Sequence, residues 1–441
     1  MAMVVKNNMS ALSTLNTLNK NTNALSKSLQ KVSSGMKINS AADDASGYAI
    51  SERMRVQIRS LDQANSNAQN GGSMMKVAEG AVSSTVEILK TLKEKAVNAA
   101  NDTNTDADRA TIQKELDQSI DQINDNANVT FNGQYLVDGS KNKQTTATTT
   151  MMTNTSLSTA TTSDTKLTDL AARNGDNLNI HSTDTITVSY VKDGKTYSSS
   201  VQVSTNTLQE VVNKLGKHKE GNTEVTDLKM GSYTSIITAK DGSGNTVYTA
   251  SGLNGVTVEA AKSGVTSQIA GFTISITDNK GNVNKSANAA LDAFDESLRA
   301  ANKSADNSIV LQIGTKANQS IKVGLTDMKA TALGLQGKDG STLSVGTQVK
   351  ANAAINVLDS AIQKALDQQT TIGSIESRLE YTQSNLTTAS ENVTSAESTI
   401  RDADMAKEMM NYTKNNVLMQ AAQSMLAQAN QSSSNVLSLL Q

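Results

Sequence analysis

The sequence has no cysteine, no proline and no tryptophan among its 441 residues. Without cysteine the chain can form neither disulfides nor thiolate metal sites. Because proline removes a helix hydrogen bond and clashes with the preceding turn, its absence suits long, uninterrupted helices. Aromatic residues amount to only 2%, fewer than the core of a compact enzyme of this length normally contains.

Charge and hydropathy exclude further classes of protein. The 40 Lys and Arg residues against 42 Asp and Glu leave a net charge of −2, which gives no electrostatic case for binding nucleic acid. No run of about 18 apolar residues exists to cross a membrane, and the N-terminus lacks the apolar core of a signal peptide. Composition alone therefore predicts a cytoplasmic protein, an inference that fails for an export route that reads no such signal.

The residues that usually carry chemistry are scarce and scattered. The two histidines, His181 and His218, are 37 positions apart, and the His-Glu-x-x-His spacing of a catalytic zinc site does not occur. Neither a phosphate-binding glycine loop nor a nucleophile elbow is present. Residues 241–245 resemble part of a calcium loop without its later glutamate and predict a turn. Asp43 and Asp44 suit the start of a helix, where acids stabilise the helix dipole. We expect no catalytic, cofactor-binding or metal-binding residues.

What the sequence does contain is apolar residues at heptad spacing near both ends. The terminal stripes predict subunit-packing residues at Val4, Leu15, Leu18, Leu25, Leu29 and Val32, and at Leu418, Ala421, Met425, Leu426, Leu437 and Leu440. A second pair of stripes predicts a helical seam made of Leu61, Met75, Val82, Leu89, Leu92, Leu379, Leu386, Val393 and Ile400. Because each stripe is half of an interface, we expect the two ends of the chain to pair.

The remaining elements follow from local signals. Helices are predicted over 1–32 and 45–100, with 41–44 opening the second and Gly71-Gly72 as its weak point or bend. A third helix follows a polar turn at 101–106, and a hairpin is predicted around 131–137. The Thr-rich stretch 144–165 predicts a linker or an extended surface segment. Residues 178–285 predict an inserted α+β domain with an Asp193-Gly194 hairpin, a capped helix after Thr207 and strands at 232–239, 256–258 and 272–276. Helix is predicted again at 287–301 and 351–366, with a hairpin between them. The predicted fold class is mainly α, with long coiled-coil termini forming a rod and a β-rich insert.

Five stretches carry a family resemblance. They are 33–47 (SSGMKINSAADDASG), 131–133 (FNG), 390–392 (SEN), 396–408 (AESTIRDADMAKE) and 423–430 (QSMLAQAN). Together they resemble the N- and C-terminal signatures of bacterial flagellin. The resemblance covers about 1–138 and 306–441, whereas the middle carries no such match.

The resemblance implies a structural subunit, not an enzyme, that self-polymerises into the flagellar filament for swimming motility. It implies paired terminal helices at 1–40 and 405–441 in the inner tube, a helical rod domain at 41–140 and 286–404 in the outer tube, and a projecting variable domain at 141–285. It further implies an extracellular location reached by flagellar type III export, and flagellar cap proteins, hook-associated proteins and an export chaperone at the C-terminal helix as partners.

Elementary energetics give this assembly a physical reason. Each buried Leu or Ile contributes only about 1.5–3 kcal/mol, against a backbone ordering cost of roughly 1–2 kcal/mol per residue. A single narrow seam therefore holds the terminal helices weakly within one chain, and neighbouring subunits would supply the rest of the burial. Folding of the ends is then expected to accompany polymerisation.

A further implication concerns host recognition. Many flagellins are bound by Toll-like receptor 5 through the long outer-tube helix, which 88–98 matches here, and through the helix after it. Strongly recognised members carry Arg at the position of Thr91 and Leu at that of Lys95, and Glu115 matches their second-helix glutamate. Thr91 lacks the multi-donor geometry of a guanidinium. We therefore expect weak signalling through a patch comprising Lys90, Thr91, Lys95 and Glu115.

Two alternatives stay open at the level of sequence. A hook–filament junction protein shares related terminal helices; the runs at 405–408 and 428–430 favour flagellin, and self-polymerisation of the purified protein discriminates between the two. A flagellin with a protease in its insert would need a zinc motif that this sequence lacks.

Overall fold

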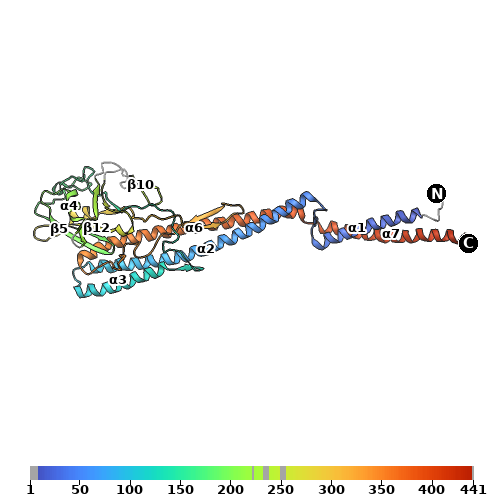
Figure 1. The fold of residues 1–441 in the computed structure, drawn as a ribbon, viewed down its shortest axis with the longest axis horizontal. Coiled ribbons are helices and arrows are strands. Elements are labelled where there is room, and N and C mark those ends of the chain that lie inside the picture. Colours follow the sequence, from blue (N-terminus) through green and yellow to red (C-terminus); the bar gives the residue numbers. More distant parts are fainter. Residues whose placement is uncertain (1–7, 221–222, 232–237, 249–254, 440–441) are drawn as a thin grey trace. The chain divides into compact units, whose positions relative to one another are not determined.

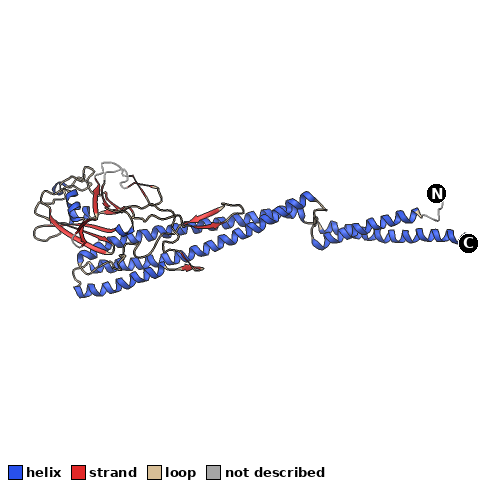
Figure 2. Cartoon of the chain, viewed as in Figure 1, coloured by secondary structure: helices blue, strands red, loops and turns tan. Residues whose placement is uncertain are grey.

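The computed structural model describes residues 8–220, 223–231, 238–248 and 255–439. Val4 and Leu440 lie outside the described residues, as does the side chain of Leu437. The chain divides into two compact units. One comprises Met1–Ala68, Gln312–Gln319 and Tyr381–Gln441, and the other comprises Gln69–Leu311 and Ser320–Glu380. Long helices belong to the two ends of the chain and strands to its middle, so the predicted fold class is confirmed (Figures 1 and 2).

In the first unit, helices α1 (Met9–Ser34) and α7 (Met405–Leu439) lie side by side and antiparallel (Figure 1). The side chain of Asn8 caps α1 by accepting a hydrogen bond from the backbone N–H of Ala11 at 3.0 Å. Gly35 ends the helix in the left-handed region at φ 71°, where its N–H bonds to the carbonyl of Lys31. Both ends of α1 therefore follow from local sequence.

Helix α2 (Ala45–Ala99) begins four residues later than the sequence suggested. Asp43 and Asp44 lie before the first turn of α2, where their carboxylates accept hydrogen bonds from nearby backbone N–H groups. Asp44 accepts from the backbone N–H groups of Ser46 and Gly47, each at 3.0 Å, and so caps the start of the helix. Helix α2 continues without a break through Gly71 and Gly72, where the sequence predicted a weak point or a bend. A Cβ on Gly71 would lie 2.6 Å from Leu311, so this glycine allows the hairpin to approach the helix closely.

Helix α3 (Asp106–Ala127) follows α2 along the chain and belongs to the second unit. Thr105 and Asp108 form a reciprocal capping box at its start. Its inward face buries Leu116, Ile120 and Ile123. A short hairpin follows, in which β1 (Thr130–Phe131) pairs antiparallel with β2 (Gln134–Tyr135). Asn132 and Gly133 both have positive φ in its turn.

The strand-rich middle of the chain contains two larger sheets (Figure 2, red). One has the strand order β13-β3-β11-β8, formed by Phe294–Leu298, Met151–Asn154, Val256–Ala260 and Leu228–Gly231. The other has the order β12-β4-β5, formed by Ile269–Thr277, Thr185–Lys192 and Lys195–Gln202. The same part of the chain also contains two-stranded sheets. They are formed by β6 (Lys217–Glu220) with β7 (Thr223–Thr226), β9 (Thr238–Lys240) with β10 (Thr246–Tyr248), and β14 (Ile309–Gln312) with β15 (Ser320–Val323).

Several local predictions for this region are confirmed. Asp193 and Gly194 form the turn between β4 and β5, both with positive φ. Helix α4 (Leu208–Leu215) carries the expected capping box between Thr207 and Glu210. Of the strand predicted at 232–239, residues 232–237 lie outside the described residues. Two 3₁₀ turns, at Leu167–Asp169 and Val265–Ser267, and helix α5 (Lys285–Leu291) complete the middle of the chain.

The Thr-rich stretch 144–165 is not a linker throughout, because it contains the buried strand β3. The Thr153 hydroxyl lies within hydrogen-bond distance of the hydroxyls of Thr257 and Ser297, at 3.2 and 3.1 Å. Asn154 donates its side-chain amide to the carbonyl of Ala290 at 2.7 Å. Small polar side chains are thus satisfied by neighbouring strands, a stabilisation that composition alone does not reveal.

The helix predicted over 287–301 is also only partly right. Helix α5 ends at Leu291, and β13 then pairs antiparallel with β3. The helix predicted over 351–366 and the seam that begins at 372 form one continuous helix, α6 (Gln348–Arg401). Strand β12 lies against α6, where Asn356 donates to the carbonyl of Phe272 at 3.2 Å. Within the described residues, none of the helices combines the length and apolarity needed to cross a bilayer.

Candidate subunit-packing surfaces

Helices α1 and α7 meet along a line of small and polar side chains. Ser28 and Ala422 are buried on this line. The side-chain amide of Asn8 donates to the carbonyl of Ala429, and that of Asn21 donates to the carbonyl of Leu418, each at 3.2 Å. Side-chain-to-backbone hydrogen bonds of this kind require close approach, and they determine the register of the two helices.

The packing residues predicted on α1 divide between two faces. Leu18, Leu25 and Val32 are half-buried on the side that faces α7, and Leu426 of α7 is half-buried as well. Leu15 and Leu29 are 41% and 51% exposed. Within one chain both leucines therefore lie largely outside the α1–α7 contact, and their predicted role in subunit packing stays a prediction. Asn21 and Ser28 belong to the contact, together with Leu18, Leu25 and Val32.

Each terminal helix therefore presents a second, exposed row of apolar side chains. On α1 the row consists of Leu12, Leu15 and Leu29, which we call the outer row of α1. On α7 it consists of Met410, Val417, Ala421 and Met425, which follow one another at seven, four and four residues and so share a face. We call these four the outer row of α7; Leu418 beside it is exposed too. Contiguous exposed apolar side chains usually mark an interaction surface.

A buried arginine joins the segments where the long helices end. Arg401, the last residue of α6, donates to a carboxylate oxygen of Glu52 at 2.6 Å and lies over the ring of Tyr48, 5.4 Å from its centroid. The hydrogen bond from Arg401 lowers the pKa of Glu52. The backbone N–H of Lys37 donates to the carbonyl of Arg401 at 2.7 Å, and that of Ala403 donates to the carbonyl of Gly35 at 2.9 Å.

This contact ties the turn between α1 and α2 to the break between α6 and α7. Sequence reasoning missed it, although Arg401 belongs to the quoted signature. The available signal was a guanidinium that directly follows a stripe of apolar residues, where a buried charge requires a partner.

The predicted helical seam lies on the inner faces of α2 and α6. Six of its residues are buried, namely Leu61, Met75, Val82, Leu89, Leu92 and Leu379. The other three, Leu386, Val393 and Ile400, are half-buried. Burial thus decreases along α6 toward its C-terminal end, where the side chains keep part of their surface available to another molecule.

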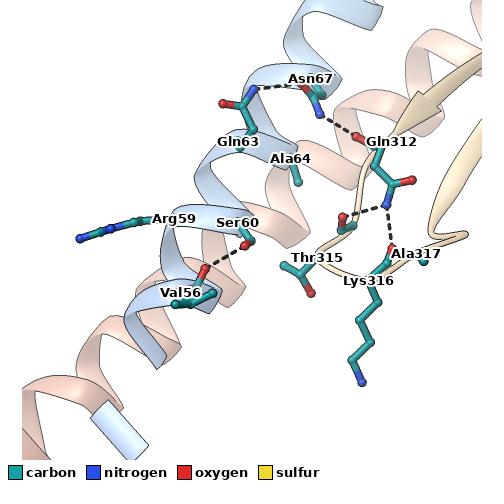
Figure 3. Close-up of a pocket in the computed structure, with 11 residues that line it drawn as sticks. Val56, Arg59, Ser60, Gln63, Ala64, Asn67, Gln312, Thr315, Lys316 and Ala317 are labelled. Carbon is teal, nitrogen blue, oxygen red and sulfur yellow. Dashed lines mark hydrogen bonds between the residues drawn. The ribbon is translucent and has the colours of Figure 1, made fainter. Parts of the chain in front are cut away.

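A groove of about 530 Å³ lies in the first unit beside α2 (Figure 3). Its lining residues are Val56, Arg59, Ser60, Gln63, Ala64 and Asn67 of α2, and Gln312, Gly314, Thr315, Lys316 and Ala317. Asn67 donates to the carbonyl of Gln312 at 3.0 Å, which holds the turn after β14 against the helix. Figure 3 shows the Arg59 and Lys316 side chains extending away from the groove floor. The groove therefore offers polar groups and two cations for contact with another surface.

The residues of the predicted receptor patch lie on α2 and α3. Lys95 forms an ion pair with Glu115 at 2.9 Å, and both side chains are partly exposed. Thr91 is exposed, and its hydroxyl donates to the carbonyl of Glu87 one turn earlier at 3.1 Å. Lys90 pairs with the Glu87 carboxylate at 2.7 Å. Lys95 and Glu115 of the predicted patch are thus paired with each other.

The two histidines lie in the strand-rich middle. His218 pairs with the buried carboxylate of Asp227, which also accepts hydrogen bonds from Tyr190 and Lys192 at 2.7 and 2.6 Å. Burial raises the pKa of Tyr190. His181 is exposed and lies 3.8 Å from Asp184. Among the residues that the structure describes, no three His, Cys, Asp or Glu side chains gather as a metal site would require.

Comparisons with known proteins match both helical ends of the chain. A model of the bacterial flagellin N-terminal helical region matches residues 5–142, and a model of the C-terminal helical region matches residues 355–440. A flagellin of Clostridium tyrobutyricum is 35% identical over 433 residues, which cover 97% of this chain and 99% of that protein. The chain belongs to the bacterial flagellins.

Further relatives agree with this assignment over the full length. Flagellin of Bacillus subtilis (strain 168) is 30% identical over 458 residues, covering 99% of this chain and 100% of that protein. Flagellin C of Vibrio cholerae is 31% identical over 445 residues, covering all of both. As a flagellin, the protein is a structural subunit that self-polymerises into the bacterial flagellar filament and serves motility. The resemblance read from the sequence is confirmed, and full-length relatives named flagellin favour the filament subunit over the hook–filament junction alternative.

Proposed function

We propose that the outer rows of α1 and α7 carry the contacts between flagellin subunits in the filament. The observation that supports this is their exposure, since Leu15 and Leu29 of α1 and Met425 of α7 remain exposed although α1 and α7 are paired. Subunits joined by different faces of two helices make a heterologous contact, and such contacts that do not close produce an open helical polymer.

The proposal extends to the division of the chain. Residues 1–40 and 405–441 form the inner tube of the filament, 41–140 and 286–404 form the outer tube, and 141–285 project as the variable domain. The terminal helices fold fully only on assembly, because each buries a single narrow face within one chain and gains its remaining burial from neighbours. The groove at Arg59 and Lys316, which lies in the outer-tube segments, remains available for contact.

A charge placed in the outer row of α1 tests the proposal. Leu15→Asp combined with Leu29→Asp leaves the α7 contact untouched and forces two carboxylates into the subunit interface. We expect the variant to yield no filaments by electron microscopy, while circular dichroism keeps the helical signal of α2 and α6. Lys20→Asp, an exposed change outside the row, serves as the matched control and assembles normally. Normal filaments from the double variant would refute the proposal.

The proposed partners follow from the family and from the exposed faces. The chain leaves the cell by flagellar type III export and becomes extracellular on the flagellum. Flagellar cap and hook-associated proteins contact the assembled subunit, and an export chaperone covers α7, whose outer row offers it an apolar helix face. Binding of that chaperone is expected to fall when Met425 is replaced by Asp, as measured by co-purification.

Recognition by Toll-like receptor 5 is proposed to be weak. The ion pair between Lys95 and Glu115 supports this, because a receptor must break it before contacting the glutamate. Thr91 beside it offers a hydroxyl already bonded to its own helix, instead of a guanidinium.

A further inference from the structure

The methionines of this flagellin differ widely in exposure. The sequence contains 16. Those of the second unit are buried, and Met75 of α2 is 0% exposed. Five of those in α1 and α7 are exposed and Met419 is half-buried; Met410 and Met425 of α7 are 67% and 64% exposed. A thioether oxidises in proportion to its access to oxidant, so these two sulfur atoms are among the most vulnerable described.

Met410 and Met425 are also the two ends of the outer row of α7. Between them on the same face lie Val417 and Ala421. Methionine suits a surface that must adapt to a neighbouring copy, because its unbranched side chain rotates freely and its sulfur is polarisable. The inference that follows rests on the proposed function, in which a second copy of this chain covers the row.

We propose that Met410 and Met425 are oxidation sites through which a peroxide blocks assembly of the free subunit. The thioether sulfur attacks the peroxide, the O–O bond breaks, one oxygen forms the sulfoxide and the other leaves as water. The sulfur is oxidised by two electrons and the peroxide is reduced. The product is a polar side chain where a neighbouring copy requires an apolar one.

Assembly itself protects these sulfurs. A row covered by a neighbouring subunit is closed to solvent, so the same dose of peroxide modifies the free chain and spares the filament. The oxidised row must lose the hydration of each sulfoxide oxygen to enter the interface, without a donor positioned to replace it. Oxidation therefore acts before incorporation.

The experiment compares peroxide-treated monomer with peroxide-treated filament, using the full chain. Peptide mass spectrometry measures sulfoxide at each methionine, and sedimentation measures the critical concentration for assembly. In treated monomer we expect sulfoxide at Met410 and Met425 with Met75 unmodified. We expect the critical concentration to rise about tenfold, which corresponds to about 1.4 kcal/mol. Treated filament should stay unmodified at both outer-row positions.

Two sets of variants separate the outer row from other exposed methionines. Met410→Leu with Met425→Leu keeps volume and hydrophobicity, and this variant should assemble normally after peroxide. The matched control replaces Met9, Met405 and Met409 by Leu; these three are exposed but lie outside the row, and the control should remain sensitive.

Three outcomes would overturn the proposal. They are equal sensitivity of the outer-row variant and the unmodified chain, normal assembly of a chain oxidised at both positions, and oxidation of both positions within the filament. Assembly of untreated protein is measured in parallel. Failure of untreated chains to assemble would count against the proposed packing surfaces, not against the oxidation sites.

Discussion

The guanidinium of Arg401 donates to the carboxylate of Glu52 at 2.6 Å, joining the last residue of α6 to the first turns of α2. Around this pair the backbone of Lys37 reaches the carbonyl of Arg401 at 2.7 Å. The turn between α1 and α2 and the break between α6 and α7 are thus held together at Arg401. These contacts stabilise both interruptions of the helices, which the sequence makes without proline.

Replacement of Arg401 by Met should destabilise the contact between the α1–α2 turn and the α6–α7 break. The variant keeps the apolar stem but removes the donor from a buried hydrogen-bonded network, at a cost of about 1–3 kcal/mol. We expect faster amide exchange in residues 36–52, measured by mass spectrometry, with no change in 106–127. Arg53→Met, which alters an exposed arginine of α2, is the control. Equal exchange in the Arg401 variant and the unmodified chain would show that the Arg401–Glu52 pair does not stabilise residues 36–52.

Hydrogen exchange on free subunits should show residues 1–32 and 410–441 unprotected, and the same residues should be protected in filaments. The reason is the narrow contact between α1 and α7, which leaves the outer rows exposed. Residues of α2 around Leu89 should be protected in both states, because they are buried within one chain. Strong protection of both ends in a verified monomer would contradict coupled folding.

Glu296 gives the protein a pH dependence of defined sign. One carboxylate oxygen accepts from Arg299 at 3.1 Å, while the other is buried without a hydrogen-bond partner among the described residues. Burial raises the pKa of Glu296. A carboxyl with a higher pKa in the folded state binds its proton more tightly there, so its contribution to stability falls as pH rises from the unfolded value toward the folded one.

Glu296→Gln should therefore raise the free energy of unfolding at neutral pH and lose that advantage below about pH 4. The expected gain is on the order of 1 kcal/mol for each unit by which the pKa is raised. Denaturant melts across pH 3 to 7 measure it. Asp295→Asn, an exposed change on the same strand, should leave the pH profile unaltered. A Gln variant that is less stable than the unmodified chain at pH 7 would reverse the sign argued here.

Host-receptor signalling should respond to two substitutions on α2. Thr91→Arg supplies a planar, multi-donor group, and Lys95→Leu frees Glu115 from its ion pair while adding an apolar side chain. We expect the double variant to gain about tenfold or more in potency in a Toll-like receptor 5 reporter assay on monomer, since interface hot spots are worth at least about 2 kcal/mol. Lys76→Arg, a change that keeps the charge of an exposed lysine of α2 outside the patch, serves as the control. Full potency of the unmodified protein, or no gain in potency of the double variant, would contradict this prediction.

Local sequence alone determined much of this protein. The absence of proline and the heptad spacing predicted the long terminal helices, the reciprocal side chains of Thr207 and Glu210 predicted the start of α4, and Asp193-Gly194 predicted the β4–β5 turn. These features succeed because the interactions that stabilise them lie within a few residues along the chain, where spacing and residue type are sufficient.

Only the tertiary structure decided the rest. The Thr-rich residues of β3 became a strand because β11 and β13, each more than 100 positions away, supply its backbone partners. The direction of Leu15 and Leu29 depended on Ser28 and Asn21 approaching α7, which a heptad pattern with two apolar faces leaves undetermined. Arg401 found Glu52 across 349 positions. In each case the stabilising partner is distant in sequence, so its identity is set by packing and by the requirement that buried polar groups be satisfied.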